Sequence, residues 1–272
     1  HQPLIRRGQK LVEVGWDEAI THVDKRMALC EGEAIAAVCS ATATNEEAYL
    51  FGQLARDIWR TPWASLRGRE VSGGDRRFGD GFTVRADKMP NGRGVKEVAA
   101  QLHIELVPLD QLWHEMTTGR IRAAYVLAGH PCETFAKAEL DALASVEFLV
   151  VQMAVESELS EIASVILPGA TAFEKAGTFT NVDGRVQYNR RALPPVGSAW
   201  PDWQVLLQLG KVAGLDWNYR DPLEIATALG GRHAAAMTAE AEANSGQAYG
   251  GGWATRLQRR GFIHIEDHSK KV

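Results

Sequence analysis

The densest group of polar side chains in this sequence lies in residues 171–187, which read TAFEKAGTFTNVDGRVQ. It directly follows the apolar run ASVILPGA at 163–170. Carboxylates, amides, hydroxyls and a guanidinium at this density are typical of a loop that holds something, because each supplies hydrogen-bonding groups. The candidate cofactor-binding residues of the run are Glu174, Thr178, Asn181, Asp183 and Arg185.

The same run also supports a purely structural interpretation. Asn181 and Asp183 can form Asx-turns, and Gly177 and Gly184 permit a positive φ. Arg185 can pair with a neighbouring carboxylate, either Glu174 or Asp183. These roles explain the composition of the loop without any ligand, and the sequence favours them.

Two residues outside this run are further candidates. Asn45 opens the run NEEAYLFGQLARDIW, where it or Thr44 can instead cap a helix. His130, in AGHPCET, follows an apolar run and is the best lone catalytic candidate. A single His beside a Pro turn is more often a loop residue, and no Glu, Asp or second His lies at ligand spacing to it. The sequence therefore assigns no catalytic residue and no metal ligand.

The three cysteines, Cys30, Cys39 and Cys132, lie far apart and form no CxxC pair. An iron–sulfur cluster or a structural zinc ion needs four closely spaced ligands of this type. Neither can be built from these cysteines. Thiols in a reducing cytosol are expected, with Cys132 as a weak redox candidate.

Residues 56–96 concentrate positive charge. The net charge of −4 divides into +5 for this segment and −9 for the remainder. Such asymmetry indicates a basic patch. Three interpretations stay open: a docking face or phosphate-binding remnant, a solvated loop with internal ion pairs, and a functional cofactor pocket. The interface candidates are Arg67, Arg69, Arg76 and Arg77.

Apolar runs of strand length alternate with amphipathic helices along most of the chain. Continuous apolar runs separated by helices indicate a parallel sheet covered on both faces. The sequence thus predicts a doubly wound α/β fold, whose loops 40–45, 129–134 and 154–158 converge at the carboxyl ends of the strands, where ligands bind. The predicted strands are 33–40, 121–129, 146–154 and 164–168, and the predicted helices are 14–30, 45–59, 94–102, 110–119, 134–145, 157–163 and 200–212.

Residues 60–96 show little periodicity and are predicted to be a long Arg- and Gly-rich loop over the sheet, with 82–86 as a candidate strand. We expect an α/β domain over residues 1–213 and a C-terminal helical extension and tail over 214–272. The tail contains an Ala-rich helix, and its last dozen residues are expected to be poorly ordered unless a partner docks them.

Four segments, in order, resemble the molybdopterin oxidoreductase family. They are PLIRRGQKLVEVGWDEAI at 3–20, TNEEAYLFGQLAR at 44–56, ADKMPNGRGVKEVA at 86–99, and the stretch 156–203 with EKAGTFTN and DGRVQ. The likeness implies an α/β domain similar to a reduced form of the first three formate dehydrogenase domains. The sequence looks most like the C-terminal domain of the large iron–sulfur subunit of NADH–quinone oxidoreductase (complex I).

The resemblance also implies which cofactors this chain and its parent subunit are expected to hold. Catalytic members carry a Cys, selenocysteine or Ser molybdenum ligand after the second segment, whereas residues 57–81 hold no Cys. The flanking lobes that enclose the pterin in those members are not expected in this chain either. The resemblance therefore implies no cofactor in this chain and [4Fe–4S] clusters, with a [2Fe–2S] cluster as a further expectation, in the parent subunit. The candidate binding residues then become remnants of a cofactor site.

The function implied is structural. The domain would buttress the cluster-bearing region and meet neighbouring subunits of a complex I-like, NAD-linked hydrogenase or formate dehydrogenase assembly, as part of an oxidoreductase but without catalytic residues of its own. Two alternatives stay open. One is a reduced, formate-dehydrogenase-like enzyme that binds molybdopterin guanine dinucleotide, and the other is a stand-alone module that binds a small ligand in the strand-end crevice.

Composition narrows the partner classes. A net charge of −4 gives no overall attraction to nucleic acid. No apolar run approaches the roughly 20 residues needed to span a bilayer, so membrane insertion is not expected. No GxGxxG follows a strand, which weakens a NAD-binding interpretation. We expect a cytoplasmic protein, peripheral to the inner membrane as part of a complex, and the start at His1 suggests a fragment or a processed product.

Overall fold

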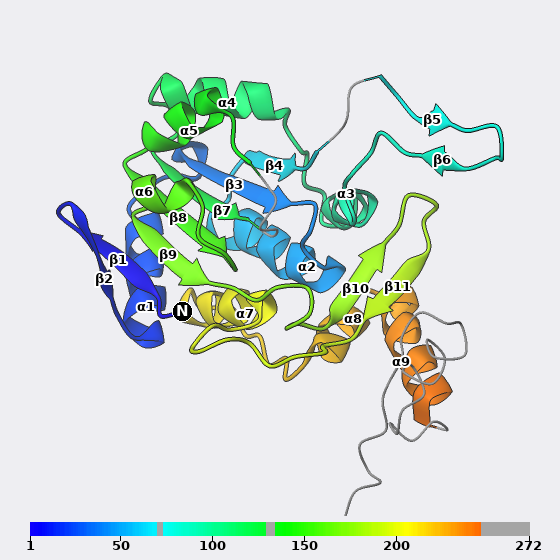
Figure 1. Ribbon diagram of the computed structural model, residues 1–272. Helices are drawn as coiled ribbons and strands as arrows, with labels where there is room; N and C mark the ends of the chain where they lie inside the picture. Colours follow the sequence, from blue (N-terminus) through cyan, green and yellow to red (C-terminus); the bar gives the residue numbers. More distant parts are fainter. Residues whose placement is uncertain (70–72, 129–133, 246–272) are drawn as a thin grey trace, which may run out of the picture.

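A seven-stranded sheet runs through the protein (Figure 1). The structure, a computed structural model, describes residues 1–69, 73–128 and 134–245. The strands of this sheet are β1 (Leu4–Arg7), β2 (Lys10–Glu13), β3 (Ile35–Ser40), β4 (Trp63–Arg67), β7 (Ala123–Leu127), β8 (Phe148–Met153) and β9 (Val165–Pro168). Their order is β2-β1-β9-β8-β7-β3-β4. The five strands from β9 to β4 are parallel, and β1 pairs antiparallel with both β2 and β9.

Helices cover both faces of the sheet, as the doubly wound prediction requires (Figure 1). They are α1 (Trp16–Met27), α2 (Asn45–Gln53), α3 (Gly92–Gln101), α4 (Leu109–Thr117), α5 (Lys137–Ala144), α6 (Leu159–Ile162), α7 (Asp202–Val212), α8 (Pro222–Leu229) and α9 (Gly231–Ser245). Ala37 and Cys39 of β3 belong to a core shared with α1, α2, α3, α7 and α8. The alternate residues Ala36 and Val38 belong to a second core shared with α4, α5 and α6. Because alternate residues of a strand face opposite sides of the sheet, β3 contributes side chains to both cores.

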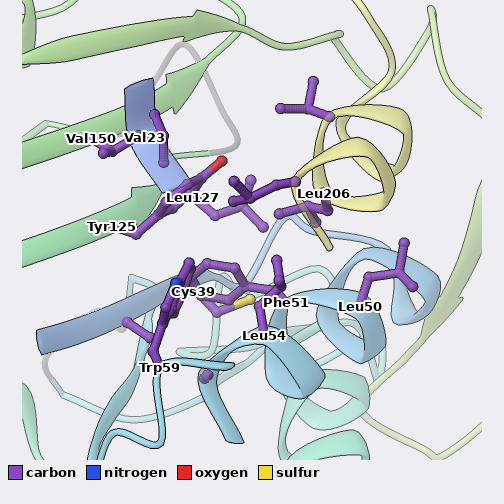
Figure 2. Close-up of a cluster of buried hydrophobic side chains, with 14 of the residues drawn as sticks. Val23, Cys39, Leu50, Phe51, Leu54, Trp59, Tyr125, Leu127, Val150 and Leu206 are labelled. Atoms are coloured by element: carbon purple, nitrogen blue, oxygen red, sulfur yellow. The ribbon is translucent and has the colours of Figure 1, made fainter. Parts of the chain in front are cut away.

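The larger core is centred on aromatic rings (Figure 2). The ring of Tyr125 lies 5.4 Å from that of Phe51 and 5.4 Å from that of Trp59, measured between centroids. Trp59 follows α2, which ends in a π-helical turn at Leu54–Ile58. Fully burying one such large apolar side chain is worth about 1.5–3 kcal/mol, so this cluster anchors α2 on the sheet.

The chain reverses its direction of travel across the sheet at β3. From β3 it moves to β4 on one side, and it then returns past β3 to β7 on the other side. At such a reversal the loops that leave the two strands diverge, and ligands bind in the resulting crevice at the carboxyl ends. The loop 40–45 follows β3 at this point. Most of the loop after β7, 129–133, lies outside the described residues.

The prediction of loop throughout 60–96 is wrong for β4. Trp63, Ala64 and Ser65 are buried, and β4 pairs in parallel with β3 over five residues. The strand is short and mixed in polarity, which hides it from a periodicity search. Its one buried hydroxyl is satisfied, because Ser65 Oγ donates to the carbonyl of Val107 at 2.6 Å. The candidate strand 82–86 shrinks to β6 (Thr83–Val84), which pairs with β5 (Arg76–Arg77).

Two further hairpins were not predicted. One is β1–β2, at the edge of the main sheet. The other forms from the polar run itself, as β10 (Gly177–Thr180) paired antiparallel with β11 (Val186–Asn189). The hairpin β10–β11 contacts α2, α3, α8 and α9, so its inner face is buried by helices rather than by another sheet.

The C-terminal part of the described chain packs against the same core. Trp217, Ile225 and Leu229 belong to the larger cluster. The predicted Ala-rich helix is α9, and the predicted boundary at residue 213 stays a prediction. None of the helices in the described residues is long and apolar enough to cross a membrane.

Candidate functional site

The loop after β3 lies at the carboxyl edge of the sheet, where the strand order reverses. Ser40 Oγ lies 2.8 Å from Thr42 Oγ1 and accepts a hydrogen bond from the Thr42 amide at 3.1 Å. Thr42 is partly exposed, whereas its neighbours in the loop are buried. Ser40 is buried, so Thr42 is the residue of this loop that the edge presents to an incoming ligand.

Arg67 ends the neighbouring strand β4 and adds a cation to the same edge. Its side chain is folded inward, since the residue is only 8% exposed. Nη2 donates to the carbonyl of Thr134 at 2.6 Å and lies 3.3 Å from a carboxylate oxygen of Glu139. The guanidinium stacks on Phe135, 3.6 Å from the ring centroid. A guanidinium fixed in this way suits phosphate or carboxylate oxygens. The other interface candidates, Arg69, Arg76 and Arg77, are exposed.

The N-terminus of α2 faces the same loop but is already capped. Thr44 Oγ1 accepts from the amide of Glu47 at 3.1 Å, and Glu47 Oε2 accepts from the amide of Thr44 at 2.8 Å. This capping box satisfies amide groups that a phosphate would otherwise use. Glu46 and Glu47 also place two buried carboxylates in the first turn. Negative charge from the protein thus occupies the positive end of this helix.

Glu47 also belongs to a buried ionic trio. Lys175 Nζ donates to Glu47 Oε2 at 2.8 Å and to Asp202 Oδ2 at 2.7 Å, and the three side chains are 1–6% exposed. Burial by itself would lower the pKa of Lys175, but the carboxylates of Asp202 and Glu47 outweigh it and raise that pKa. Lys175 is therefore always charged. Burial and the nearby Asp202 raise the pKa of Glu47, which the lysine only partly offsets.

A chain of hydrogen bonds joins the trio to the middle of the sheet. Gln152, on β8, donates from Nε2 to Asp202 Oδ1 at 2.7 Å and accepts from the hydroxyl of Tyr125 at 2.5 Å. Burial raises the pKa of Tyr125 well above its ordinary value, with a further contribution from Asp202. The phenol therefore stays neutral and acts as a donor. These contacts tie α2, the sheet and α7 to one buried charge centre.

A second buried polar cluster lies between α2, β10 and α9. Asn45 Nδ2 donates to Thr178 Oγ1 at 3.0 Å and to Thr180 Oγ1 at 3.1 Å. His233, on α9, is 2% exposed, and its Nδ1 lies 3.3 Å from Thr178 Oγ1. Its Nε2 accepts from Arg232 Nε at 3.2 Å, so the neutral ring carries its proton on Nδ1. Burial and the adjacent Arg232 lower the pKa of His233 to about 4.

Glu46 completes this cluster. Its carboxylate accepts from the amide of Thr178 at 2.7 Å and from the Thr178 hydroxyl at 2.6 Å. Burial raises the pKa of Glu46 to about 7, although both Thr178 hydrogen bonds act in the opposite direction. Asn45, Glu46 and Thr178 are therefore engaged inside the protein.

The remaining candidates from the polar run form a structural turn. Asn181 Oδ1 accepts from the amides of Asp183 at 3.0 Å and Arg185 at 2.9 Å, which is the expected Asx-turn. Gly184 has a φ of +86°, as predicted, whereas Gly177 lies in β10 and has no positive φ. Glu174 accepts from the Thr171 hydroxyl and amide at 2.7 and 2.8 Å. Asp183 and Arg185 are exposed.

The structure tests the catalytic and metal expectations only in part. His130 and Cys132 lie outside the described residues. Across 1–69, 73–128 and 134–245, no group of three His, Cys, Asp or Glu side chains is placed to hold a metal ion. Cys39 is buried, and Cys30 is partly exposed.

Comparison with known proteins finds a similarity to one family. The model of the family described as Molybdopterin oxidoreductase matches residues 80–212, from the β5–β6 region to the end of α7. Residues 80–212 are thus similar to this family. The match bears out the α/β fold class and the family resemblance, and it leaves the finer likeness to the large iron–sulfur subunit of complex I unconfirmed.

Two proteins similar to this chain carry one descriptive name. A Bacillus subtilis (strain 168) protein named "Putative formate dehydrogenase YrhE" is 36% identical over 117 residues, which is 42% of this chain and 12% of the relative. A Staphylococcus haemolyticus (strain JCSC1435) protein of the same descriptive name is 41% identical over 90 residues, 33% of this chain and 9% of the relative. The matched part thus spans about a tenth of each relative.

A solved structure also resembles the chain. It is acetylene hydratase from Pelobacter acetylenicus, with a TM-score of 0.41 and 18% identity over 49% of this chain and 19% of that chain.

Sequence reasoning missed Lys175, Asp202, Gln152, Asn91 and His233 as parts of the polar clusters. Lys175 directly follows Glu174 in the sequence, but its ionic partners Glu47 and Asp202 lie 128 and 27 residues away along the chain. Asn91 donates to the carbonyl of Ala43 and accepts from the amide of Thr180, which joins the β3 loop to β10. Such long-range partners leave no local pattern.

Proposed function

We propose that this chain forms part of the pterin-binding region of a formate-dehydrogenase-like molybdopterin oxidoreductase. The observation that carries the proposal is the carboxyl edge of the sheet at the reversal of strand order. There the hydroxyl of Thr42, in the loop after β3, and the guanidinium of Arg67, at the end of β4, follow adjacent strands. Support comes from the family match over 80–212 and from the descriptive name shared by the relatives.

The chemistry of this edge fits an anionic group such as the phosphates of a pterin dinucleotide. The amides at the start of α2 are engaged by Thr44 and Glu47, so they leave phosphate contacts to the hydroxyls and to Arg67. The carboxylates of Glu46 and Glu47 face Thr178 and Lys175, whereas the carboxylate of Glu139 pairs with Arg67 and would have to yield to such a ligand. When bound, the cofactor supplies the electron-accepting centre, and this chain supplies binding and orientation.

A second candidate function is a cofactor-free structural domain of a redox assembly such as complex I. The observation in its favour is that Asn45, Glu174 and Thr178, which resemble cofactor-site positions, are all engaged by internal partners. On this view the domain buttresses a cluster-bearing region and contacts other subunits, at the periphery of the inner membrane.

Co-purification separates the two candidates. The protein would be produced in molybdenum-replete cells, and the released pterin would be measured by its fluorescence after oxidation, with molybdenum measured by mass spectrometry. We expect a pterin content near one per chain. Thr42→Val and Arg67→Met should lower it at least fivefold, since each removes a contact at the strand edge.

Arg7→Met provides the matched control, because Arg7 lies on β1 and pairs with exposed Glu18. Its pterin content should equal that of the unmodified chain. Because Arg67 is buried, melting curves would be recorded for each variant, and Thr42→Val tests the site if Arg67→Met unfolds. Pterin and molybdenum at background level in the unmodified chain would refute cofactor binding and support the structural role.

A further inference from the structure

Residues 73–88 form a protruding arm. Figure 1 shows the arm extending from the body of the protein, with β5 and β6 paired antiparallel along it. Almost every residue of the arm is exposed. A two-stranded hairpin without a third layer is marginally stable in water. The arm therefore lacks, within the described residues, the packing that usually holds such a hairpin.

One face of the arm is apolar. The pairing places Arg76 opposite Val84, and side chains two residues apart in a strand share a face. Phe78 and Phe82 therefore lie on the same face as Arg76 and Val84. Phe78, Phe82 and Val84 are 44%, 62% and 36% exposed, and the two phenyl rings are 6.0 Å apart between centroids. Single exposed apolar residues are normal on a protein surface, but these three lie together and form a patch.

Guanidinium groups flank these rings. Arg76 lies over the ring of Phe78 at 5.4 Å from its centroid, and Arg77 projects from the opposite face. Among residues 1–69, 73–128 and 134–245, neither has a carboxylate within 4.0 Å, whereas Arg85 lies 3.3 Å from Asp75 and 3.9 Å from Asp183. Arg76 and Arg77 are thus available to a partner, while Arg85 ties the arm to the β10–β11 turn.

A hollow of about 420 Å³ lies at the foot of the arm. Met89 and Val182 give it apolar walls, Arg93 and Lys96 of α3 give it cations, and Asp87 and Glu97 give it carboxylates. Arg93 is paired with Glu97 at 2.9 Å, and Lys96 has no carboxylate within 4.0 Å in the described chain. A concave, mixed surface of this kind suits protruding side chains of a protein better than a flat lipid surface.

We propose that the arm and its hollow form the docking surface for a protein partner that presents carboxylates around an apolar centre. Charge complementarity carries the choice: Arg76 and Arg77 lie on the arm beside the apolar rings, and Lys96 adds a cation in the hollow. Exposed aromatic and Arg residues are the groups that anchor protein interfaces. A partner with Asp and Glu at its rim pairs with these cations and buries Phe78 and Phe82. The proposal is independent of cofactor binding.

The experiment uses the full chain and two synthetic 20-residue peptides of amphipathic pattern, one of Glu and Leu and one of Lys and Leu. Fluorescence anisotropy in low salt measures binding. We expect the acidic peptide to bind, the basic peptide not to bind, and affinity to fall at least tenfold between about 20 and 300 mM salt. Phe78→Ser/Phe82→Ser and Arg76→Glu/Arg77→Glu should each weaken the binding at least tenfold.

Phe173→Ser is the matched control, because Phe173 is 69% exposed and lies outside the arm. It should bind the acidic peptide as the unmodified chain does. Equal affinity of both arm variants and the unmodified chain would overturn the proposal. So would a stronger preference for vesicles of anionic phosphatidylglycerol, which would make the arm a lipid-binding element. Because the substituted residues are exposed, near-UV circular dichroism should be the same for all variants.

Discussion

At the scale of single residues, the structure concentrates its most costly interactions around α2. Lys175, Glu47 and Asp202 form a trio of two acids and one base with almost no exposure to water. Desolvating such charges is expensive, and the cost is recovered only while every partner is present. Removing one member of the trio therefore destabilises the fold by more than the intact trio stabilises it.

Lys175→Met should lower the free energy of unfolding by about 3–5 kcal/mol, because it leaves the carboxylates of Glu47 and Asp202 buried without a cation. Chemical denaturation would measure the change. Lys137→Met is the control, since Lys137 is 86% exposed in its pair with Asp141. It should cost less than about 1 kcal/mol. Similar losses for both variants would contradict a buried ionic trio.

Glu46 makes stability depend on pH. Its pKa of about 7 lies above the ordinary value of 4.5, so the folded chain holds a proton that the unfolded chain releases. The contribution of Glu46 to the free energy of unfolding is therefore complete below the ordinary value and declines as pH rises to about 7, by roughly 3 kcal/mol in all. Denaturation at several pH values would show this decline.

Glu46→Gln should remove this part of the pH dependence, because the amide does not titrate. The variant is expected to resemble the unmodified chain at pH 5, where the protonated carboxyl of Glu46 offers one carbonyl acceptor and one donor as the amide does, and to lose less stability between pH 5 and 8. Glu33→Gln, at an exposed position, should follow the unmodified chain. Parallel curves for Glu46→Gln and the unmodified chain would show that Glu46 keeps an ordinary pKa.

At the scale of elements, the seating of β10 on α2 depends on close backbone approach. Gly177, the first residue of β10, faces Thr44: a Cβ placed on Gly177 would lie 2.5 Å from Thr44 Cγ2 and 2.9 Å from Glu46 Oε2. No side chain fits there without displacing the hairpin. The glycine is required by this contact and not by its φ.

Gly177→Ala should destabilise the fold by about 1–3 kcal/mol, as expected when a methyl group is forced into a packed site. Thermal and chemical denaturation would both report it. Gly79→Ala is the control, because nothing lies within 4 Å of a Cβ at that position. A change of less than about 0.5 kcal/mol for Gly177→Ala would show that β10 can move away from α2 freely.

The elements that could be predicted from the sequence are those with local patterns. The run IAAVCS followed by a Thr44 cap and two acids predicts a strand and a helix, and both are present. β4 and β10 could not be found this way, because Trp63–Arg67 and Gly177–Thr180 owe their strand conformation to pairing with β3 and with β11 rather than to alternation of their own residues.

At the scale of the whole molecule, the candidate site was only partly predictable. The strand-end position followed from the βα units and the general rule for parallel sheets. The separation of residues by role did not: Asn45, Glu174 and Thr178 face inward to protein partners, whereas Asp183 and Arg185 face solvent. The sequence alone does not separate these side chains by role. The packing of β10 against α2, which are far apart in the sequence, determines which of them remain accessible to solvent.

The buried start of α2 has a consequence for the order in which the protein acquires its structure. Glu46 and Glu47 are made early, yet the groups that seal them, Lys175, Thr178 and Asp202, emerge from the ribosome more than 120 residues later. Until then the nascent chain must keep this helix end hydrated. Contacts between residues this far apart in the sequence form slowly. Synthesis of residues 175–202 is thus what allows the start of α2 to settle.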